Sequence, residues 1–100
     1  MLGVSSILFL RIASIVSGES SRKAICSRVA RILREERLKQ NLSMTALSER
    51  AGLSQQSVSY IEREMRIPNL DTLLRITAVL EIDLEKIIAR ARKEDSVQTH

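Results

Sequence analysis

The sequence predicts an all-α fold, because its composition disfavours strands and its apolar residues recur at helical spacing. The chain has 100 residues, of which 44% are hydrophobic and 28% charged, proportions that fit one small globular domain. Its aromatic residues are Phe9 and Tyr60, and it holds three glycines and one proline. Residues that favour strands and residues that favour tight turns are therefore both scarce. We expect Leu and Ile side chains on helices to form the core.

Residues 1–21 are expected to form an apolar N-terminal extension followed by a linker. The segment Leu2–Val16 is apolar but contains Arg11, so it is too short to span a bilayer, and no cation precedes it as in a secretory signal. Its apolar positions fit both a helix and a strand. Serines and Gly18 dominate residues 17–21, which favours a linker there. Three alternatives stay open: the extension packs on the domain, packs on a second chain or has no function.

The domain itself is expected over residues 22–93 and begins with a basic amphipathic helix that ends at Asn41. From Ser27 onward, apolar side chains recur near positions i, i+3 and i+4, as on one face of a helix; they are Val29, Ile32, Leu33 and Leu38. Between residues 22 and 40, seven Lys and Arg residues stand against two Glu residues, a surplus of five positive charges in a chain of net charge +4. Such a block favours a polyanion as partner.

Two short helices separated by a glycine follow. Ser43 is the N-cap residue expected for the first, which runs to Gly52, and Ser54 is the N-cap residue expected for the second, Gln55–Arg63. Glycine readily adopts the left-handed conformation that a tight turn between the two helices requires. The pattern predicts a helix-turn-helix over Ser43–Met65.

Two further helices are expected before a flexible tail. Pro68 ends the connecting loop, and Asn69 is placed to cap a helix whose apolar residues run to Leu80. Asp83 is placed to cap the last helix, and the apolar stripe of that helix consists of Leu84, Ile87 and Ile88. Residues 94–100 carry no apolar stripe, and we expect them to be flexible.

The motif and its surroundings resemble a known family. Between Leu33 and Ile88 the chain contains AGLSQQSVSYIE, an R-x-P-x-L-x-T-L-L run and LEKII, in that order. In these features the sequence resembles the lambda-repressor-like, Cro-type helix-turn-helix transcription regulators, also called the XRE family. The resemblance implies a five-helix DNA-binding protein that reads a double-stranded operator as a homodimer, with the second helix of the motif in the major groove. The single cysteine separately favours a cytoplasmic location.

The resemblance also implies roles for individual residues. Those implied at base edges are Gln55, Gln56, Ser59 and Tyr60, and those implied at the DNA backbone are Ser43, Met44, Ser54, Ser57, Arg63 and Arg66. Arg37 and Glu62 match an ion pair that ties the first helix to the recognition helix. Met44 departs from the family, which usually has a glutamine there. Glu64 and Glu81 stand where glycine is usual, and a left-handed conformation at such a position costs about 1 kcal/mol.

Catalysis is not expected from this chain. Cys26 and His100 are the single residues of their kinds, so we expect neither an internal disulfide nor a Cys or His metal site. The sequence has no Gly-rich phosphate loop, and its carboxylates lie among arginines at helix-surface spacing, which favours ion pairs. We therefore expect no enzyme activity, no cofactor and no metal.

The expected assembly is a homodimer. The apolar surface of Leu84, Ile87 and Ile88, together with Leu2–Val16, exceeds what a small domain easily buries, so we expect it to form the dimer contact. An alternative function is the antitoxin half of a toxin–antitoxin pair, which shares the implied fold and would have a toxin as protein partner. A third alternative is a helical scaffold that binds no nucleic acid.

Overall fold

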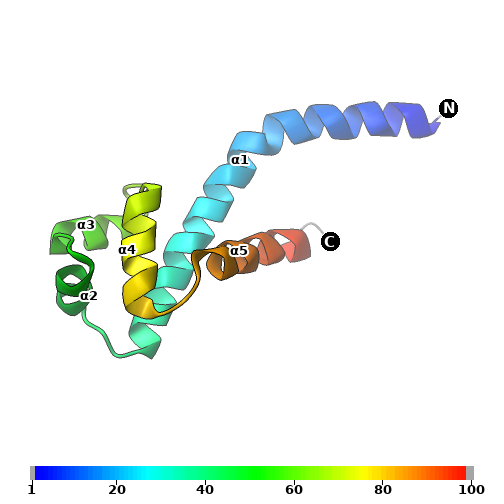
Figure 1. Cartoon of the computed structure of the whole chain (residues 1–100). Helices are drawn as coiled ribbons and strands as arrows, with labels where there is room; N and C mark the ends of the chain where they lie inside the picture. The colour runs from blue at the N-terminus through cyan, green and yellow to red at the C-terminus, as the bar shows by residue number, and fades with distance from the viewer. Residues whose placement is uncertain (1, 99–100) are drawn as a thin grey trace.

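Five helices build the molecule. The computed structural model describes the backbone of residues 2–98 and the side chains of residues 21–94. The helices are α1 (Leu2–Lys39), α2 (Met44–Ala51), α3 (Gln55–Glu62), α4 (Leu70–Leu80) and α5 (Leu84–Gln98), and the described backbone contains no strand (Figure 1). The expected all-α fold with five helices is therefore confirmed.

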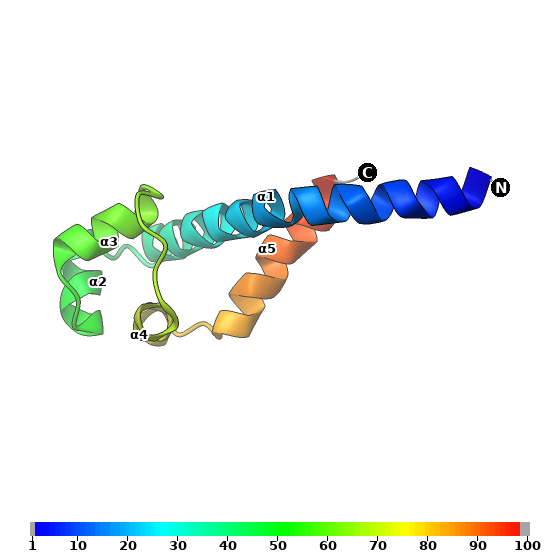
Figure 2. The same ribbon diagram turned by 90° about the horizontal axis from the view of Figure 1, so that it is seen from above.

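The second half of α1 is the support on which the other helices are arranged. α1 contacts α3, α4 and α5, whereas α2 contacts α3 and α4. Figure 1 and Figure 2 show the first half of α1 running on past this bundle, away from α2 and α3. The molecule is accordingly elongated, with principal extents of 59 × 21 × 19 Å. Within the described part of the chain, no helix is both long and apolar enough to cross a bilayer.

α1 is longer than the sequence indicated. The helix is continuous from Leu2 to Lys39, so the linker expected at residues 17–21 is wrong, and Leu2–Val16 is helical rather than extended. Each residue added to an existing helix gains a backbone hydrogen bond, and one glycine costs only about 1 kcal/mol relative to alanine. Gly18 and its neighbouring serines are therefore too weak a signal to end the helix. The side chains of Leu2–Val16, and the packing expected for them, lie outside the described residues.

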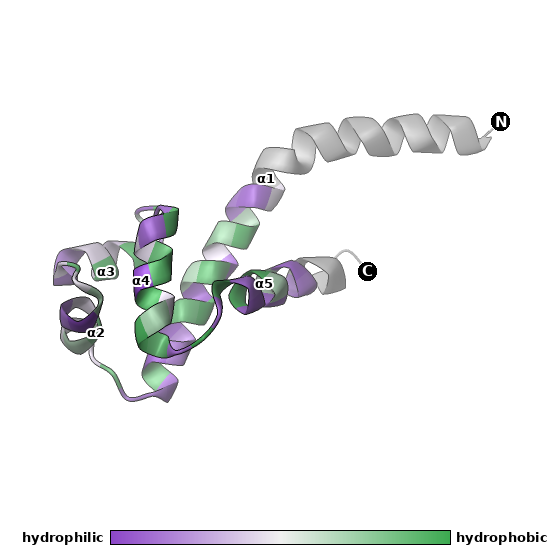
Figure 3. Cartoon of the chain, in the orientation of Figure 1, coloured by the Kyte–Doolittle hydropathy of each residue, from purple (hydrophilic) through white to green (hydrophobic). Residues whose placement is uncertain are grey.

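The core lies where the helices of the bundle meet. Figure 3 shows hydrophobic and hydrophilic residues alternating along α4 and the second half of α1, as expected for helices with one buried face. The core cluster consists of Val29, Ile32, Leu33, Leu47, Val58, Ile61, Ile76, Leu80, Ile87 and Ala91. Leu38, which the sequence pattern placed with the inward-facing residues, is instead 52% exposed. The preceding residue, Arg37, takes the buried position.

α5 buries most of the stripe that the sequence assigned to a dimer surface. Leu84 and Ile87 are buried, and Ile88 is half-buried against the core. The expectation that these residues present surplus apolar surface is therefore wrong, because α1 and α5 pack directly against each other. α5 also continues to Gln98, so the flexible tail expected from residue 94 is wrong up to that point. Glu94 supports this last stretch by pairing with Arg28 and Arg31 of α1.

Within the described backbone, three residues other than glycine adopt the left-handed conformation where helices end. Their φ angles are 57° at Asn41, 61° at Glu64 and 58° at Glu81. Asparagine adopts this conformation readily, whereas glutamate adopts it at a cost in conformational free energy. The left-handed backbone expected at Glu64 is confirmed, and Glu81 adopts it as well. α4 begins as expected at Asn69, whose Oδ1 accepts a hydrogen bond from the backbone N–H of Thr72 at 2.8 Å.

Candidate nucleic-acid interface

Serine caps fix where α2 and α3 begin. Ser43 Oγ accepts a hydrogen bond from the backbone N–H of Ala46, and Ser54 Oγ accepts one from the backbone N–H of Ser57, each at 3.0 Å. The first N–H groups of a helix have no intrahelical partner, and such a cap satisfies one of them and stabilises the helix by about 1 kcal/mol. Both caps are as the sequence predicted. Other N–H groups at the start of α3 remain available to an anion.

The turn between α2 and α3 depends on Gly52 and on a side chain from α4. Gly52 has a φ of 70°, and a Cβ at this position would lie 3.0 Å from Arg75 Nη1. Arg75 Nη1 donates to the carbonyl oxygen of Ala51 at 3.5 Å, and Arg75 Nε donates to Asp71 Oδ2 at 2.9 Å. Both the backbone conformation and the approach of Arg75 therefore favour glycine. Arg75 braces the turn from a residue 24 positions away in sequence, which no local pattern predicts.

The inner face of α3 is anchored by apolar packing and by one buried ion pair. Val58 and Ile61 are 1% and 3% exposed. Arg37 of α1 donates from Nε to Glu62 Oε2 at 2.7 Å and from Nη2 to Glu62 Oε1 at 2.9 Å, and both side chains are less than 10% exposed. The hydrogen bond with Glu62 raises the pKa of Arg37 above its ordinary value. The ion pair that the sequence indicated is thus present, and it fixes α3 on α1.

The outer face of α3 presents polar side chains. Gln55 and Gln56 are exposed, while Ser57, Ser59 and Tyr60 are half-buried. Gln56 Nε2 donates to Tyr60 Oη at 2.6 Å, and the guanidinium carbon of Arg66 lies 5.4 Å from the centre of the Tyr60 ring. The four residues expected at base edges, Gln55, Gln56, Ser59 and Tyr60, therefore lie together on one short helix. α3 ends at Glu62, one residue before the predicted end, and Arg63 is its C-cap.

The residues expected to contact a DNA backbone lie at both ends of this face and differ in exposure. Arg63 and Arg66 are exposed beyond the end of α3, and Ser43 and Ser54 are exposed at the starts of α2 and α3. Ser54 Oγ also donates to Ser57 Oγ at 2.8 Å, so the two hydroxyls act together at the cap. Met44 differs from the others, because its side chain is half-buried and packs against the core.

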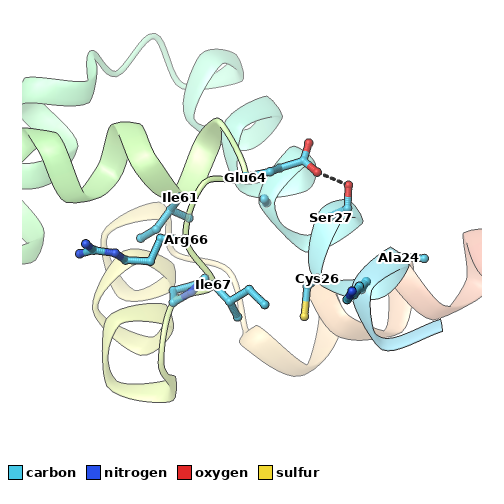
Figure 4. A pocket seen from close by; sticks show the side chains of 10 residues that line it. Ala24, Cys26, Ser27, Ile61, Glu64, Arg66 and Ile67 are labelled. Carbon is cyan, nitrogen blue, oxygen red and sulfur yellow. Dashed lines mark hydrogen bonds between the residues drawn. The ribbon is translucent and has the colours of Figure 1, made fainter. Parts of the chain in front are cut away.

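A contact that sequence reasoning missed lies behind α3. Ser27 Oγ donates to Glu64 Oε1, across 37 positions of sequence, so the left-handed Glu64 is held against α1. Figure 4 shows this hydrogen bond beside a cavity of about 480 Å³, around which Ile61, Ile67 and Cys26 lie. The guanidinium of Arg66 points away from Cys26. Glu64 and Arg66 both line the cavity, so it lies beside the loop that follows α3, and no spacing in the sequence indicated it.

α2 and α3 pack against each other and are joined by a tight turn at a left-handed glycine, and α3 begins at a serine cap and exposes a polar face. This is the geometry of a helix-turn-helix. A sequence model of the family described as helix-turn-helix matches residues 33–87. The match begins within α1 and ends within α5, so it includes α2, α3 and α4 entirely. Because it covers more than half of the chain, the protein belongs to the helix-turn-helix family.

The chain is also similar to named regulators. Two curated relatives from two strains of Mycobacterium tuberculosis, the uncharacterized HTH-type transcriptional regulators MT0491 and Rv0474, are each 36% identical to it over 59 residues. This region is 59% of the present chain and 42% of each relative, so the chain spans less than half of the relatives' length. Among solved structures, SinR, a master regulator for biofilm formation, was crystallised in complex with DNA. It matches 60% of this chain and 97% of its own with a TM-score of 0.57 and 24% identity, which supports the fold.

Proposed function

We propose that the protein binds double-stranded DNA in a sequence-specific manner and regulates transcription, with α3 in the major groove. The observation that carries the proposal is the outer face of α3, where two exposed glutamines stand at a capped helix start. The major groove admits an α-helix, and the side chains at the start of that helix reach the base edges. The names of the relatives favour a transcriptional regulator over the antitoxin alternative.

Gln55 and Gln56 are the residues that we assign to the base edges first. A glutamine amide both accepts from adenine N6 and donates to adenine N7, which makes adenine its preferred base. Ser59 and Tyr60 lie about one turn further along α3 and are assigned to further contacts at base edges. These four side chains come from one helix, so α1 and α2 position the base-reading surface as a unit through the Arg37–Glu62 pair and the apolar core.

Arg63 and Arg66 are assigned to phosphates on the strand beyond the end of α3. The exposed N–H groups at the starts of α2 and α3, beside Ser43, Ser54 and Ser57, are assigned to phosphates near the other end, because helix N-termini favour anions. At Met44 we assign only the backbone N–H to DNA, since its side chain packs against the core. In this arrangement the phosphate contacts set the position of α3, and the base contacts set the sequence.

We further propose that the protein acts as a homodimer on two half-sites centred about 34–36 Å apart, because one recognition helix covers only a few base pairs. Because Leu84 and Ile87 are buried within the domain, we assign the dimer contact to another surface. The surface that we assign consists of Ile67, Leu70 and Leu74, which are 68%, 63% and 51% exposed. Leu70 and Leu74 lie one turn apart on α4 and so share a face. Since this surface follows α3 in the chain, a two-fold contact through it joins the two DNA-reading units.

Alanine substitutions at the two glutamines test the base assignment. Gln55→Ala and Gln56→Ala should each cost about 1–3 kcal/mol on the preferred duplex and should relax discrimination at different base pairs. The measurement is a binding titration against duplexes changed one base pair at a time. Arg63→Ala is the control, because loss of one phosphate contact should weaken all duplexes alike and reduce the slope of log affinity against log salt by about one. Unchanged discrimination in both glutamine variants would contradict the assignment.

A charge placed on the assigned dimer surface tests the assembly. Leu74→Glu should give a folded monomer, because two carboxylates would face each other across the two-fold axis without a partner. Sedimentation at micromolar concentration measures the change, with Leu38→Glu as the matched control on an equally exposed leucine of α1 (52% against 51%). A wild-type protein that sediments as a monomer both alone and on DNA would overturn the dimer proposal and leave the base assignment standing.

A further inference from the structure

One hydrogen bond on the outer face of α3 joins two residues that the proposed function assigns to bases. Gln56 Nε2 donates to Tyr60 Oη at 2.6 Å. The two residues are four apart, which places them on the same face of the helix. Gln55, the adjacent residue with the same side chain, makes no such bond within the described part of the chain. The two glutamines therefore differ in how firmly the protein holds them.

The acceptor of this hydrogen bond is itself held in place. The Tyr60 ring is half-buried, and the Arg66 guanidinium lies 5.4 Å from its centre, within the range of a cation–π contact. Tyr60 therefore lies between an arginine from the loop after α3 and a glutamine from the first turn of α3. Met44 on α2 carries no group that could hydrogen-bond a glutamine amide in the same way, and its side chain packs on the core. Among these side chains, Tyr60 alone fixes Gln56.

We propose that Tyr60 is a positioning residue, which aims the amide of Gln56 so that this glutamine accepts adenine and rejects guanine. The inference rests on the proposed function, and it assigns to Tyr60 a role through Gln56 in addition to any base contact of its own. With Nε2 turned toward Tyr60 Oη, the amide oxygen Oε1 is left to face a base. The second hydrogen on Nε2 remains free, so the amide still offers one acceptor and one donor.

The chemistry of the base edges makes this orientation selective. Adenine offers the N6 amino group as donor and N7 as acceptor, whereas guanine offers two acceptors, N7 and O6. A glutamine amide that rotates freely can turn its NH₂ group toward guanine. One that is held on Tyr60 faces guanine with Oε1 opposite O6, so that O6 has no donor and two oxygens repel each other, although Nε2 can still donate to N7. Holding the side chain in advance also reduces the conformational entropy that binding must remove.

The hydrogen bond can be tested in the free protein, without DNA. Tyr60→Phe removes the acceptor hydroxyl and keeps the ring that packs against α3 and Arg66. In nitrogen-15 NMR spectra of the whole chain, we expect the Gln56 side-chain amide to shift and to become as mobile as that of Gln55, while the Gln55 amide stays unchanged. A Gln56 amide that is already as mobile as Gln55 in the wild type would overturn the proposal.

The selectivity is tested on duplexes that carry adenine or guanine at the base pair whose discrimination Gln56→Ala abolishes. Tyr60→Phe should reduce the preference for adenine about three- to tenfold at this base pair, the range expected from freeing one side chain, and should leave the base pair read by Gln55 unchanged. Added to Gln56→Ala, it should have no further effect on the preference. An unchanged ratio, or equal weakening on all duplexes, would show that the hydroxyl acts elsewhere and would overturn the proposal.

These outcomes separate the inference from the proposed function. A wild-type protein that prefers no duplex over another would contradict the proposed function and, with it, the preference for adenine. The NMR comparison would still decide whether Tyr60 holds Gln56. A wild-type protein with strong sequence preference and a mobile Gln56 amide would leave the proposed function intact and remove the positioning role of Tyr60.

Discussion

The α2–α3 unit and the α1–α5 pair are stabilised in opposite ways. α2 and α3 are eight residues each, and each is fixed at its start by a serine cap whose partner lies three residues away. α1 and α5 are held together over a long contact, with Arg90 donating to Glu36 at 2.9 Å across 54 positions and Glu94 pairing with Arg31 across 63. The two short helices thus begin at local contacts, whereas α1 and α5 are joined by residues that lie far apart in the sequence.

This difference follows from what each region has to do. A short helix has too few internal hydrogen bonds to be stable alone, so its ends and one apolar face determine its position. α3 keeps its outer face free for a partner because Val58, Ile61 and the Arg37–Glu62 pair hold its inner face. α1 and α5 have no such task in the proposed function, and they can use their full lengths for packing. The Arg37–Glu62 pair is the link between the two regions.

Cutting this link should have the largest effect. Arg37→Met leaves the Glu62 carboxylate buried without its cation, and loss of one partner of a buried pair costs about 3–5 kcal/mol. The free energy of unfolding in urea measures the loss, and Lys86→Met is the control, since Lys86 and Asp83 form a pair 3.9 Å apart whose side chains are 75% and 63% exposed. The double change Arg37→Met with Glu62→Leu should recover most of the stability. A loss below about 1 kcal/mol for Arg37→Met, typical of surface pairs, would show that α3 does not depend on α1 in this way.

The α1–α5 contact should show a smaller effect that depends on pH. The hydrogen bond from Arg90 lowers the pKa of Glu36 below its ordinary value. A carboxyl whose pKa is lower in the folded state stabilises the fold above its ordinary pKa and loses this contribution as pH falls through the lowered value. Glu36→Gln should therefore destabilise the protein at neutral pH, by less than about 1 kcal/mol because Arg90 is well exposed.

Urea unfolding of the Glu36→Gln variant and the wild type at several pH values measures this contribution. The difference between the two proteins should close as the pH falls through the carboxyl range. Glu35→Gln is the matched control, because the ion pair of Glu35 among the described side chains is with Arg31 of the same helix, at 3.6 Å. A difference for Glu36→Gln that stays constant from neutral to acid pH would mean that the Glu36 charge does not join α1 to α5.

The same contrast explains how much of the fold the sequence could predict. Caps act within three residues, so Ser43, Ser54 and Asn69 correctly indicated the starts of α2, α3 and α4, and Gly52 indicated the turn. The contact between α1 and α5 has no local signal. Because this contact could not be read from the sequence, residues 94–98 were predicted to be flexible although they are helical. For the same reason Leu84 and Ile87 were predicted to form a dimer surface although they are buried.

The candidate site shows the same division. The polar outer face of α3, with Gln55 and Gln56 exposed, follows directly from helical spacing once Val58 and Ile61 are recognised as buried. Gln56 and Tyr60 are four residues apart, so helical spacing could also have predicted the hydrogen bond between them. The contacts of Arg75 at the turn and of Ser27 with Glu64 could not be predicted in this way, because their partners lie 24 and 37 positions away. Local spacing thus predicts which side chains α3 exposes, whereas distant contacts determine how α3 is held on the rest of the molecule.

Selection of bound duplexes from a random pool tests the central claim, that an exposed α3 reads DNA sequence, most directly. The wild-type protein should enrich a two-fold symmetric sequence with adenine in each half-site, and the half-sites should lie about one helical turn apart. A protein carrying both Gln55→Ala and Gln56→Ala should still bind DNA in a salt-dependent manner but enrich no such sequence. If the wild-type protein enriches no sequence, or if the double variant enriches the same one, α3 is not the base-reading element and the account is contradicted.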